Sequence, residues 1–211
     1  SQQLIVTKKN LPNVTIVASD NEVCEGTPVT LNAGWVSGYS YQWSTGSTER
    51  QIVINSAGTY SLQVSANGCT AIDSTTITMH PLPDIVFSGD LAICKGNMAT
   101  VYATAPNASS FLWNTGSTVN NISVLPMVNT NYWVTVEDVF GCVNQDTVLV
   151  RVEDLPTPTI AGPDTICVGG SATLVASGGM SYLWDDGSTD AERLVNAAGD
   201  YAVTVFTSAG C

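Results

Sequence analysis

Hydrophobic and polar residues alternate along short stretches of the chain with a period of two, which is typical of β-strands with one buried face. β-Branched runs occupy 14–18 and 29–32, and large and small side chains alternate over 39–43 and 60–64. No stretch sustains the helical period of 3.6 residues. We therefore predict an all-β chain with no helices of note.

The pattern of strands and turns occurs three times. Each copy carries a Leu-Pro pair, a Cys-x-Gly motif, a Trp-x-x-Gly-Ser-Thr motif, a strand that contains Tyr and a final Gly-Cys pair. The Trp motif starts at Trp43, Trp113 and Trp184. Because glycine tolerates the positive φ of tight turns, this motif predicts a turn directly after a strand.

These landmarks define copy 1 as 11–81, copy 2 as 82–154 and copy 3 as 155–211. Six or seven short strands can bury one face of each sheet only against a second sheet, so each copy is predicted to be a small β-sandwich. The alternation places the following large side chains inside: Tyr41, Trp43, Tyr60, Leu62, Val64, Phe111, Trp113, Tyr132, Tyr182, Trp184 and Tyr201.

The first ten residues match the end of a copy, because 4–7 precede Leu11-Pro12 as 76–79 precede Leu82-Pro83. Copy 3 reaches its second cysteine without a corresponding final strand. We expect a window from a longer array, in which 1–10 is the last strand of an upstream repeat. The alternative is that this strand fills the gap in the last copy of another molecule.

Two cysteines per copy predict disulfides, because the zinc motifs that use cysteine need closely spaced pairs. The six cysteines are Cys24, Cys69, Cys94, Cys142, Cys167 and Cys211. Disulfides imply an oxidising compartment outside the cytoplasm.

Two pairings stay open. Cysteines can pair within each copy, but an immunoglobulin-type connectivity would place the two sulfurs at opposite ends of the sandwich, and a disulfide needs Cα atoms within about 7 Å. Alternatively Cys24 pairs with Cys142 and Cys94 with Cys211, which leaves Cys69 and Cys167 for neighbours outside the window.

Charge and composition exclude several classes of function. The chain has 18 acidic and 6 basic residues, a net charge of −12 that opposes nucleic-acid binding. No apolar window is long enough to insert into a membrane. His80 is the sole histidine and is expected as an exposed side chain in a linker, and oxidised cysteines cannot act as nucleophiles. We therefore predict no enzyme activity and no cofactor.

The combination of C-x-G, Y/F-x-W-x-x-G-S-T, the strand that contains Tyr and G-C resembles the immunoglobulin-like or PKD-like repeats of giant Bacteroidota surface proteins. The resemblance covers 11–211 and the preceding strand, and it is specific for the repeat class rather than for one parent protein. It implies export by type IX secretion, location at the cell surface and, in some parents, a filament or adhesin role in gliding motility.

The resemblance also implies a modification. Bacteroidota O-glycosylation uses Asp followed by Ser or Thr, and the matching acceptor residues here are Ser74, Thr147 and Thr165. The simpler interpretation is a solvated Asp beside strand residues.

Residues found in one copy only are candidates for binding. Trp35, Trp133 and Phe140 could stack on sugars or anchor a protein contact, or could instead cover a loop or a neighbouring domain. Asp185, Asp186 and Asp190 crowd one turn and form a weak candidate for a calcium site, although Asp-Gly is also a strong hairpin signal.

The predicted function is mechanical: a structural shaft segment of a large extracellular bacterial adhesin, which holds a distal binding region away from the cell. Its expected partners are neighbouring repeats of the same long chain and cell-surface or glycan ligands. The alternative is a carbohydrate-binding or spacer module of a secreted enzyme.

Overall fold

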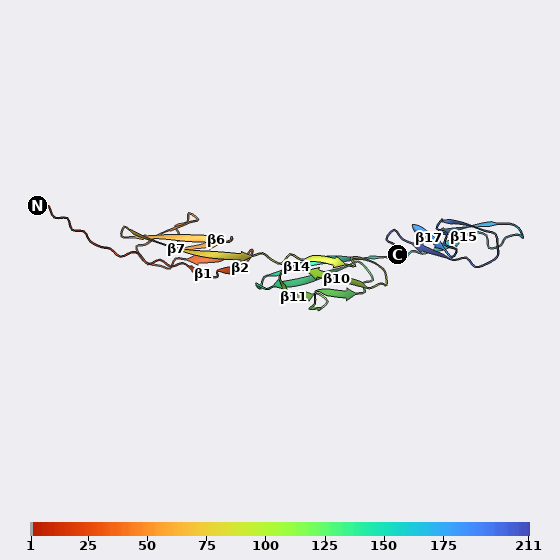
Figure 1. Ribbon diagram of the computed structural model, residues 1–211, viewed down its shortest axis with the longest axis horizontal. Coiled ribbons are helices and arrows are strands. Elements are labelled where there is room, and N and C mark those ends of the chain that lie inside the picture. The colour runs from red at the N-terminus through yellow and green to blue at the C-terminus, as the bar shows by residue number, and fades with distance from the viewer. Residues whose placement is uncertain (1) are drawn as a thin grey trace. The chain divides into compact units, whose positions relative to one another are not determined.

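A computed structural model describes residues 2–211, and none of these residues lies in a helix (Figure 1). The prediction of an all-β chain is confirmed. The strands belong to two compact units, 2–84 with 105–110 and 136–144, and 85–104 with 111–135 and 145–211. The segments of copy 2 at 105–110 and 136–144 thus group with copy 1, whereas the rest of copy 2 groups with copy 3.

Copy 1 is a sandwich of two sheets, with the orders β1-β3-β5 and β2-β7-β6-β4. Its strands are β1 (Val17–Ala18), β2 (Glu22–Cys24), β3 (Val29–Asn32), β4 (Ser40–Trp43), β5 (Gln51–Ile54), β6 (Gly58–Ala66) and β7 (Cys69–His80). The short strand β2 runs parallel to the end of β7, and the other pairs are antiparallel. This two-sheet arrangement is that of an immunoglobulin-like sandwich.

Copy 2 repeats this order with the sheets β8-β10-β12 and β9-β14-β13-β11. Its strands are β8 (Val86–Gly89), β9 (Ala92–Cys94), β10 (Ala99–Thr104), β11 (Ala108–Trp113), β12 (Asn121–Val124), β13 (Thr130–Asp138) and β14 (Val143–Glu153). The pairing of β9 with β14 is again parallel.

Copy 3 has one full sheet and one reduced sheet. The full sheet has the order β15-β16-β18, and the other contains β17 and β19 alone. The strands are β15 (Thr159–Ala161), β16 (Ala172–Ser177), β17 (Ser181–Trp184), β18 (Glu192–Val195) and β19 (Val203–Phe206). No counterpart of β2 or β7 is present among the described residues of this copy.

The Trp motif forms the centre of each sandwich. All three indoles are buried, and each donates its Nε1–H to a backbone carbonyl six residues later. The glycine of the motif has positive φ at Gly46, Gly116 and Gly187, and its N–H bonds the carbonyl of the Trp. The predicted turn is therefore confirmed, and it leads the chain from a strand of one sheet towards a strand of the other sheet while the buried indole is satisfied.

Most of the predicted interior is buried, but four of the aromatic rings expected there are only half-buried: Tyr41, Phe111, Tyr182 and Tyr201. The strand expected over 14–18 is shorter than predicted, because only Val17–Ala18 pairs with β3. Just before this strand, the Ile16 N–H donates to the Asp73 carboxylate at 2.8 Å. This side-chain acceptor takes the place of a backbone hydrogen bond between strands.

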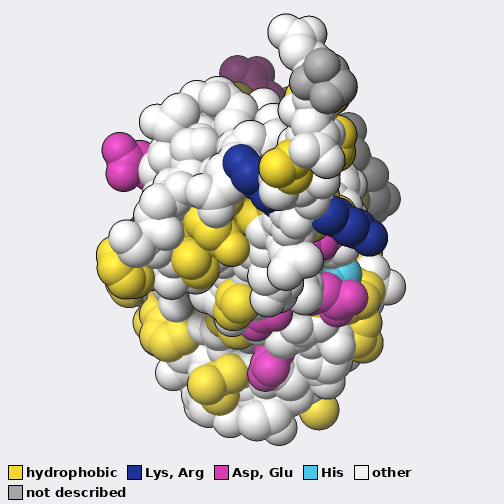
Figure 2. All heavy atoms as spheres, turned by 90° about the vertical axis from the view of Figure 1, so that its left-hand side faces the viewer, with side chains coloured by type: hydrophobic (Ala, Val, Ile, Leu, Met, Phe, Trp, Pro, Cys, Tyr) yellow, Lys and Arg dark blue, Asp and Glu magenta, His cyan; other side chains and the backbone are white. Residues whose placement is uncertain are grey.

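The surface exposes many large hydrophobic side chains, among them Leu4, Trp35 and Val168. On the face shown in Figure 2, hydrophobic side chains are interspersed with polar ones and basic side chains are few. Within 2–211 there is no helix of the length and apolarity that crossing a membrane requires.

Candidate functional site

Two disulfides are the most distinctive chemical feature of the chain. They join Cys24 to Cys142 and Cys94 to Cys211, with Cα–Cα distances of 5.5 Å and 5.4 Å. Each bond links the first cysteine of one copy to the second cysteine of the next copy, which is the second of the two pairings left open by the sequence. Cys69 is half-buried and Cys167 exposed, and both are thiols in this structure.

The parallel strand β2 explains why Cys24 does not bond to Cys69. Cys24 lies in register with His80 at the end of β7, whereas Cys69 begins β7. The 12 residues of β7 separate these positions by roughly 36 Å at about 3.3 Å per residue. A disulfide spans a Cα separation of about 7 Å at most. Pairing within copy 1 is therefore geometrically excluded.

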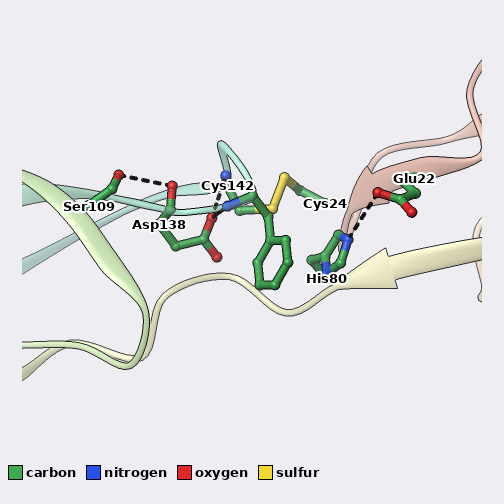
Figure 3. Close-up of a disulfide and its surroundings, with 7 residues drawn as sticks. Glu22, Cys24, His80, Ser109, Asp138 and Cys142 are labelled. Carbon is green, nitrogen blue, oxygen red and sulfur yellow. Dashed lines mark hydrogen bonds and ion pairs between the residues drawn. A yellow bond between two sulfur atoms is a disulfide. The ribbon is translucent and has the colours of Figure 1, made fainter.

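A buried carboxylate shapes the turn that carries Cys142. Asp138 Oδ1 accepts the backbone N–H groups of Phe140 and Cys142, both at 2.9 Å (Figure 3). The Asp138 carbonyl accepts the Gly141 N–H at 3.1 Å and the Ser109 hydroxyl at 3.0 Å. The backbone donors near the sulfur are thereby satisfied, and the cysteine is held in one position.

Copy 3 builds the same turn with a different residue. The Thr207 hydroxyl accepts the Cys211 N–H at 3.1 Å, and the Thr207 N–H donates to the Cys211 carbonyl at 2.8 Å. Sequence reasoning missed both Asp138 and Thr207. Both residues stand four positions before the second cysteine of their copy, and this shared position is the sequence signal that could have identified them.

The first cysteines of copies 1 and 2 also lie in a repeated turn. The N–H of Glu25 donates to the His80 carbonyl at 2.8 Å, and the N–H of Lys95 donates to the Glu153 carbonyl at 2.8 Å. Each N–H belongs to the residue after the cysteine, and each carbonyl belongs to the end of the long strand beside it. The bonded cysteine is thus anchored to the last strand of its own copy.

His80 is not the exposed linker side chain that the sequence suggested. Its side chain is 18% exposed, and its ring stacks on Phe140 with centroids 3.9 Å apart. Its Nε2 lies 3.9 Å from a carboxylate oxygen of Glu22 (Figure 3). His80 is covered because the turn of copy 2 that carries Phe140 and Cys142 packs over the end of β7.

The other two aromatic candidates differ in exposure. Trp35 is 70% exposed in a loop before β4, and Trp133 is 38% exposed on β13. The Phe140 ring has one face occupied by His80. Trp35 is therefore the most accessible of the three aromatic candidates.

The candidate O-glycosylation residues Ser74, Thr147 and Thr165 are all exposed. In the first two, the preceding Asp accepts the N–H of the candidate residue, at 2.9 Å for Ser74 and 2.7 Å for Thr147. The local backbone geometry is thus alike at these two sites.

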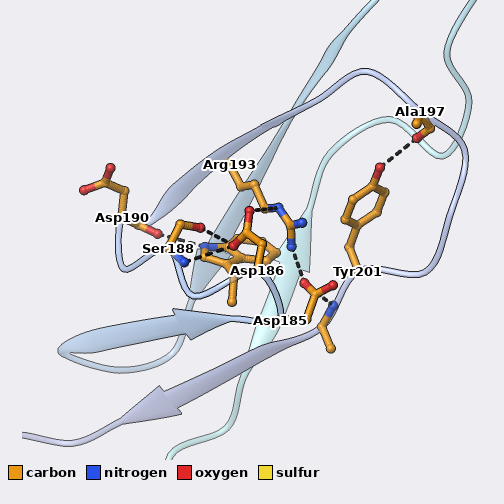
Figure 4. Close-up of polar contacts among 9 residues, drawn as sticks. Asp185, Asp186, Ser188, Asp190, Arg193, Ala197 and Tyr201 are labelled. Atoms are coloured by element: carbon orange, nitrogen blue, oxygen red, sulfur yellow. Dashed lines mark hydrogen bonds and ion pairs between the residues drawn. The ribbon is translucent and has the colours of Figure 1, made fainter.

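The acidic turn of copy 3 holds a guanidinium (Figure 4). Arg193 pairs with Asp185 and, at 3.2 Å, with Asp186, and its Cζ lies 4.8 Å from the Tyr201 ring centroid. Asp190 takes no part in this pair. Among the described residues no group of three or more metal-ligating side chains occurs. Arg193 supplies the positive charge beside Asp185 and Asp186 in this structure, and the weak calcium candidate stays a prediction.

These contacts lower two pKa values. The hydrogen bond from Arg193 holds the pKa of Asp185 below its usual 3.8, and the backbone N–H of Ser188 does the same for the pKa of Asp186. Both carboxylates are therefore charged at neutral pH, as the ion pair requires.

Comparisons with known proteins give matches to solved structures only. No model of a protein family matches the chain, and no curated protein matches it. The three N-terminal domains of the bacteriophage RB49 Highly Immunogenic Outer Capsid protein share 14% identity at a TM-score of 0.40, covering 92% of this chain and 80% of that chain.

Murine CEACAM1b shares 10% identity at a TM-score of 0.32, covering 68% of this chain and 100% of that chain. Sidekick-1 immunoglobulin domains 1–5 share 14% identity at a TM-score of 0.34, covering 82% of this chain and 48% of that chain. Likeness at this level carries no conclusion about activity or partners, and the fold assignment rests on the strand order described above.

Proposed function

We propose that the chain is a structural shaft segment of a large extracellular bacterial adhesin. The supporting observation is that each disulfide joins successive copies rather than closing one copy on itself. A continuous load path through covalent bonds suits a part whose role is to transmit force and to keep a distal region at a distance.

The pairing has a mechanical consequence at the Leu-Pro junctions. Cys24–Cys142 spans the junction at Leu82-Pro83, and Cys94–Cys211 spans the one at Leu155-Pro156. Load can therefore pass from copy to copy through sulfur even where the backbone of a junction opens. Proline at each junction further restricts φ.

The experiment that tests this role cuts the backbone under load. A protease site is inserted between Pro81 and Leu82, and single molecules are held by their two ends while the protease is added. We expect the tether to survive cleavage and to break only after a reductant is added. Release on cleavage without reductant would contradict the proposal, and the Cys24→Ser variant, which releases at once, is the matched control.

The biological setting rests on the repeat motifs that resemble Bacteroidota surface proteins. We place the segment at the cell surface after type IX secretion, in a filament that serves gliding motility. Disulfides are typical of proteins outside the reducing cytosol, which agrees with this setting. An antibody against 11–211 should label intact cells and lose its target on the surface when type IX secretion is disabled. Unchanged labelling would exclude that route.

A second candidate function is carbohydrate binding, favoured by one observation, the 70% exposure of Trp35. A flat indole face is well suited to stacking on a sugar ring. Glycan-array binding that is lost in Trp35→Ala and kept in Trp133→Ala would support it. The absence of any glycan signal for the unmodified chain would remove it.

A further inference from the structure

The two disulfides overlap along the chain instead of closing separate loops. Cys94 lies within the loop that Cys24–Cys142 closes, and Cys142 lies within the loop that Cys94–Cys211 closes. The bonds therefore form two covalent branch points in the chain. We call the Cys24–Cys142 bond the first node and the Cys94–Cys211 bond the second node.

Three stretches of backbone connect the first node to the second: 24–94, 94–142 and 142–211. Each stretch begins at a cysteine of one node and ends at a cysteine of the other. The stretches are therefore three covalent paths in parallel, and a cut in one of them leaves the other two to hold the nodes together.

The three paths differ in length, and the difference decides which of them carries a load. The path 94–142 has 48 residue steps, whereas 142–211 has 69 and 24–94 has 70. Since an extended chain spans at most about 3.5 Å per residue, the path 94–142 is taut at roughly 170 Å. At that length the other two paths still hold 21 and 22 residue steps of slack. The path through copy 2 therefore becomes taut first and limits the extension.

The path through copy 2 also carries the load while the copies are folded. β14 begins directly after Cys142 and ends at Glu153, which is in register with Cys94. Its 11 residues extend over roughly 36 Å at about 3.3 Å per residue. The two nodes are thus connected through the folded strands of copy 2, so a force between the nodes acts on this copy.

The bodies of copies 1 and 3 are attached at one node each. In copy 1 the chain leaves Cys24 and returns to it at His80, which is in register with Cys24. In copy 3 the chain leaves Glu153, which is in register with Cys94, and returns at Cys211, which is bonded to Cys94. Each body begins and ends at the same node, so a force between the nodes does not act on it.

We propose that copy 2 carries the tension in this segment and acts as its extension stop, while the bodies of copies 1 and 3 stay folded and unloaded. Under a force that unfolds copy 2, the nodes separate until the path 94–142 is taut, and extension then ends until a disulfide is reduced. The inference rests on the proposed shaft role, because it states how that role divides the load. It also implies that three backbone cuts, one in each path, are needed to separate the nodes.

The first experiment follows the length of single molecules while the disulfides are reduced. The unmodified chain is held through tags beyond its two ends, at a force that unfolds a loaded copy, and dithiothreitol is added. Each protein disulfide becomes two thiols, and the dithiol becomes a cyclic disulfide. We expect a first step of about 21 or 22 residues, because the first reduction only moves the load to the next shortest path. The second step should be 117 or 118 residues, the sequence separation of the bond that remains, and thus about fivefold longer.

The two free thiols supply the matched control for this experiment. Cys69→Ser with Cys167→Ser should give the same two steps, since both cysteines are thiols in the structure. Three similar steps of 44 to 48 residues in the unmodified chain would reveal disulfides within the copies. That result would overturn both the inference and the proposed shaft role.

A second experiment separates the inference from the proposed function. A protease site is inserted into the loop 125–128 of the path 94–142, where Leu125, Met127 and Val128 are exposed. Cleavage under the same force should lengthen the tether by about 21 residues without release, because the load moves to the path 142–211. The distance between the nodes then grows about 1.4-fold.

The matched control is the cut between Pro81 and Leu82, which lies in the path 24–94 and should leave the length unchanged. Lengthening after this cut, with the tether intact, would refute copy 2 as the path that carries the load and would leave the shaft role standing. Release after either cut would refute both. Circular dichroism that matches the unmodified chain shows that both inserted chains fold before cleavage.

Discussion

Copy 1 and copy 3 share a sequence pattern but differ in how completely they are built. In copy 1 the Trp lies on β4 of a four-stranded sheet, and the core includes Leu62, Val64 and Ile77. In copy 3 the equivalent sheet has two strands, and the core ends at an open groove. The difference teaches that the Trp motif forms its turn and its buried indole without the last strand, whereas the last strand completes the sandwich and fixes the cysteine beside it.

The largest expected effect is the loss of stability when the buried Trp is replaced, and we expect it to differ between copy 1 and copy 3. Trp43→Ala should lower the free energy of unfolding by about 3–5 kcal/mol, the range for a large buried aromatic residue. Trp184→Ala should cost less, because a core that already opens to solvent can relax around the lost ring. Urea unfolding followed by circular dichroism measures both. Equal losses would mean that the groove does not weaken copy 3.

The next largest effect is expected when the disulfides are removed one at a time, because copy 3 should depend on its disulfide more than copy 1 does. The bonds have sequence separations of 118 and 117, so the chain-entropy contributions are closely matched. Cys24→Ser with Cys142→Ser should cost about 2–5 kcal/mol and leave copy 1 folded. Cys94→Ser with Cys211→Ser should in addition speed amide hydrogen exchange in β19, which has one sheet partner. Identical exchange in the two double variants would contradict this asymmetry.

A smaller difference in stability is expected between variants of the two turns that carry Cys142 and Cys211. Asp138 accepts two backbone N–H groups, whereas the Thr207 hydroxyl accepts one. Asp138→Ala should therefore cost about 1–3 kcal/mol by leaving buried donors unpaired, and Thr207→Ala about 0.5–1.5 kcal/mol. Thermal unfolding of the oxidised variants measures both. A larger loss for Thr207→Ala would refute the assigned role of the Asp138 carboxylate.

The smallest effect is the pH dependence of the acidic turn, which copy 1 lacks. The folded pKa values of Asp185 and Asp186 lie below the usual 3.8, so the stabilisation is complete above that pH and is lost as pH falls through the lowered values. Comparing the unmodified chain with Arg193→Met between pH 6 and 2 should show the difference in stability shrinking only at the acidic end. A difference that does not change with pH would remove the ion pair as its cause.

Much of the fold could be predicted from the sequence because strand alternation and the Trp motif are local signals. The buried indole and its turn follow from residues a few positions apart, and the two-sheet sandwich follows from the number of short strands in each copy. The first strand was predicted too long because Asp73, far along the chain, supplies the acceptor for Ile16. Contacts of that kind have no local signal.

The candidate site was less predictable for the same reason. Sequence spacing left two cysteine pairings open because it does not give the direction of β2, and the parallel register of β2 with β7 decides between them. The burial of His80 depends on a ring from the next copy, and the charge partner of Asp185 is an arginine beyond the turn. The sites that depend on long-range packing were the ones the sequence left open or described wrongly.

The central claim is that disulfides join successive copies. Its most direct measurement is peptide mapping of the non-reduced chain after pepsin digestion at acidic pH, where thiols do not exchange. We expect peptides that link Cys24 to Cys142 and Cys94 to Cys211. Peptides that link Cys24 to Cys69 or Cys94 to Cys142 would contradict it.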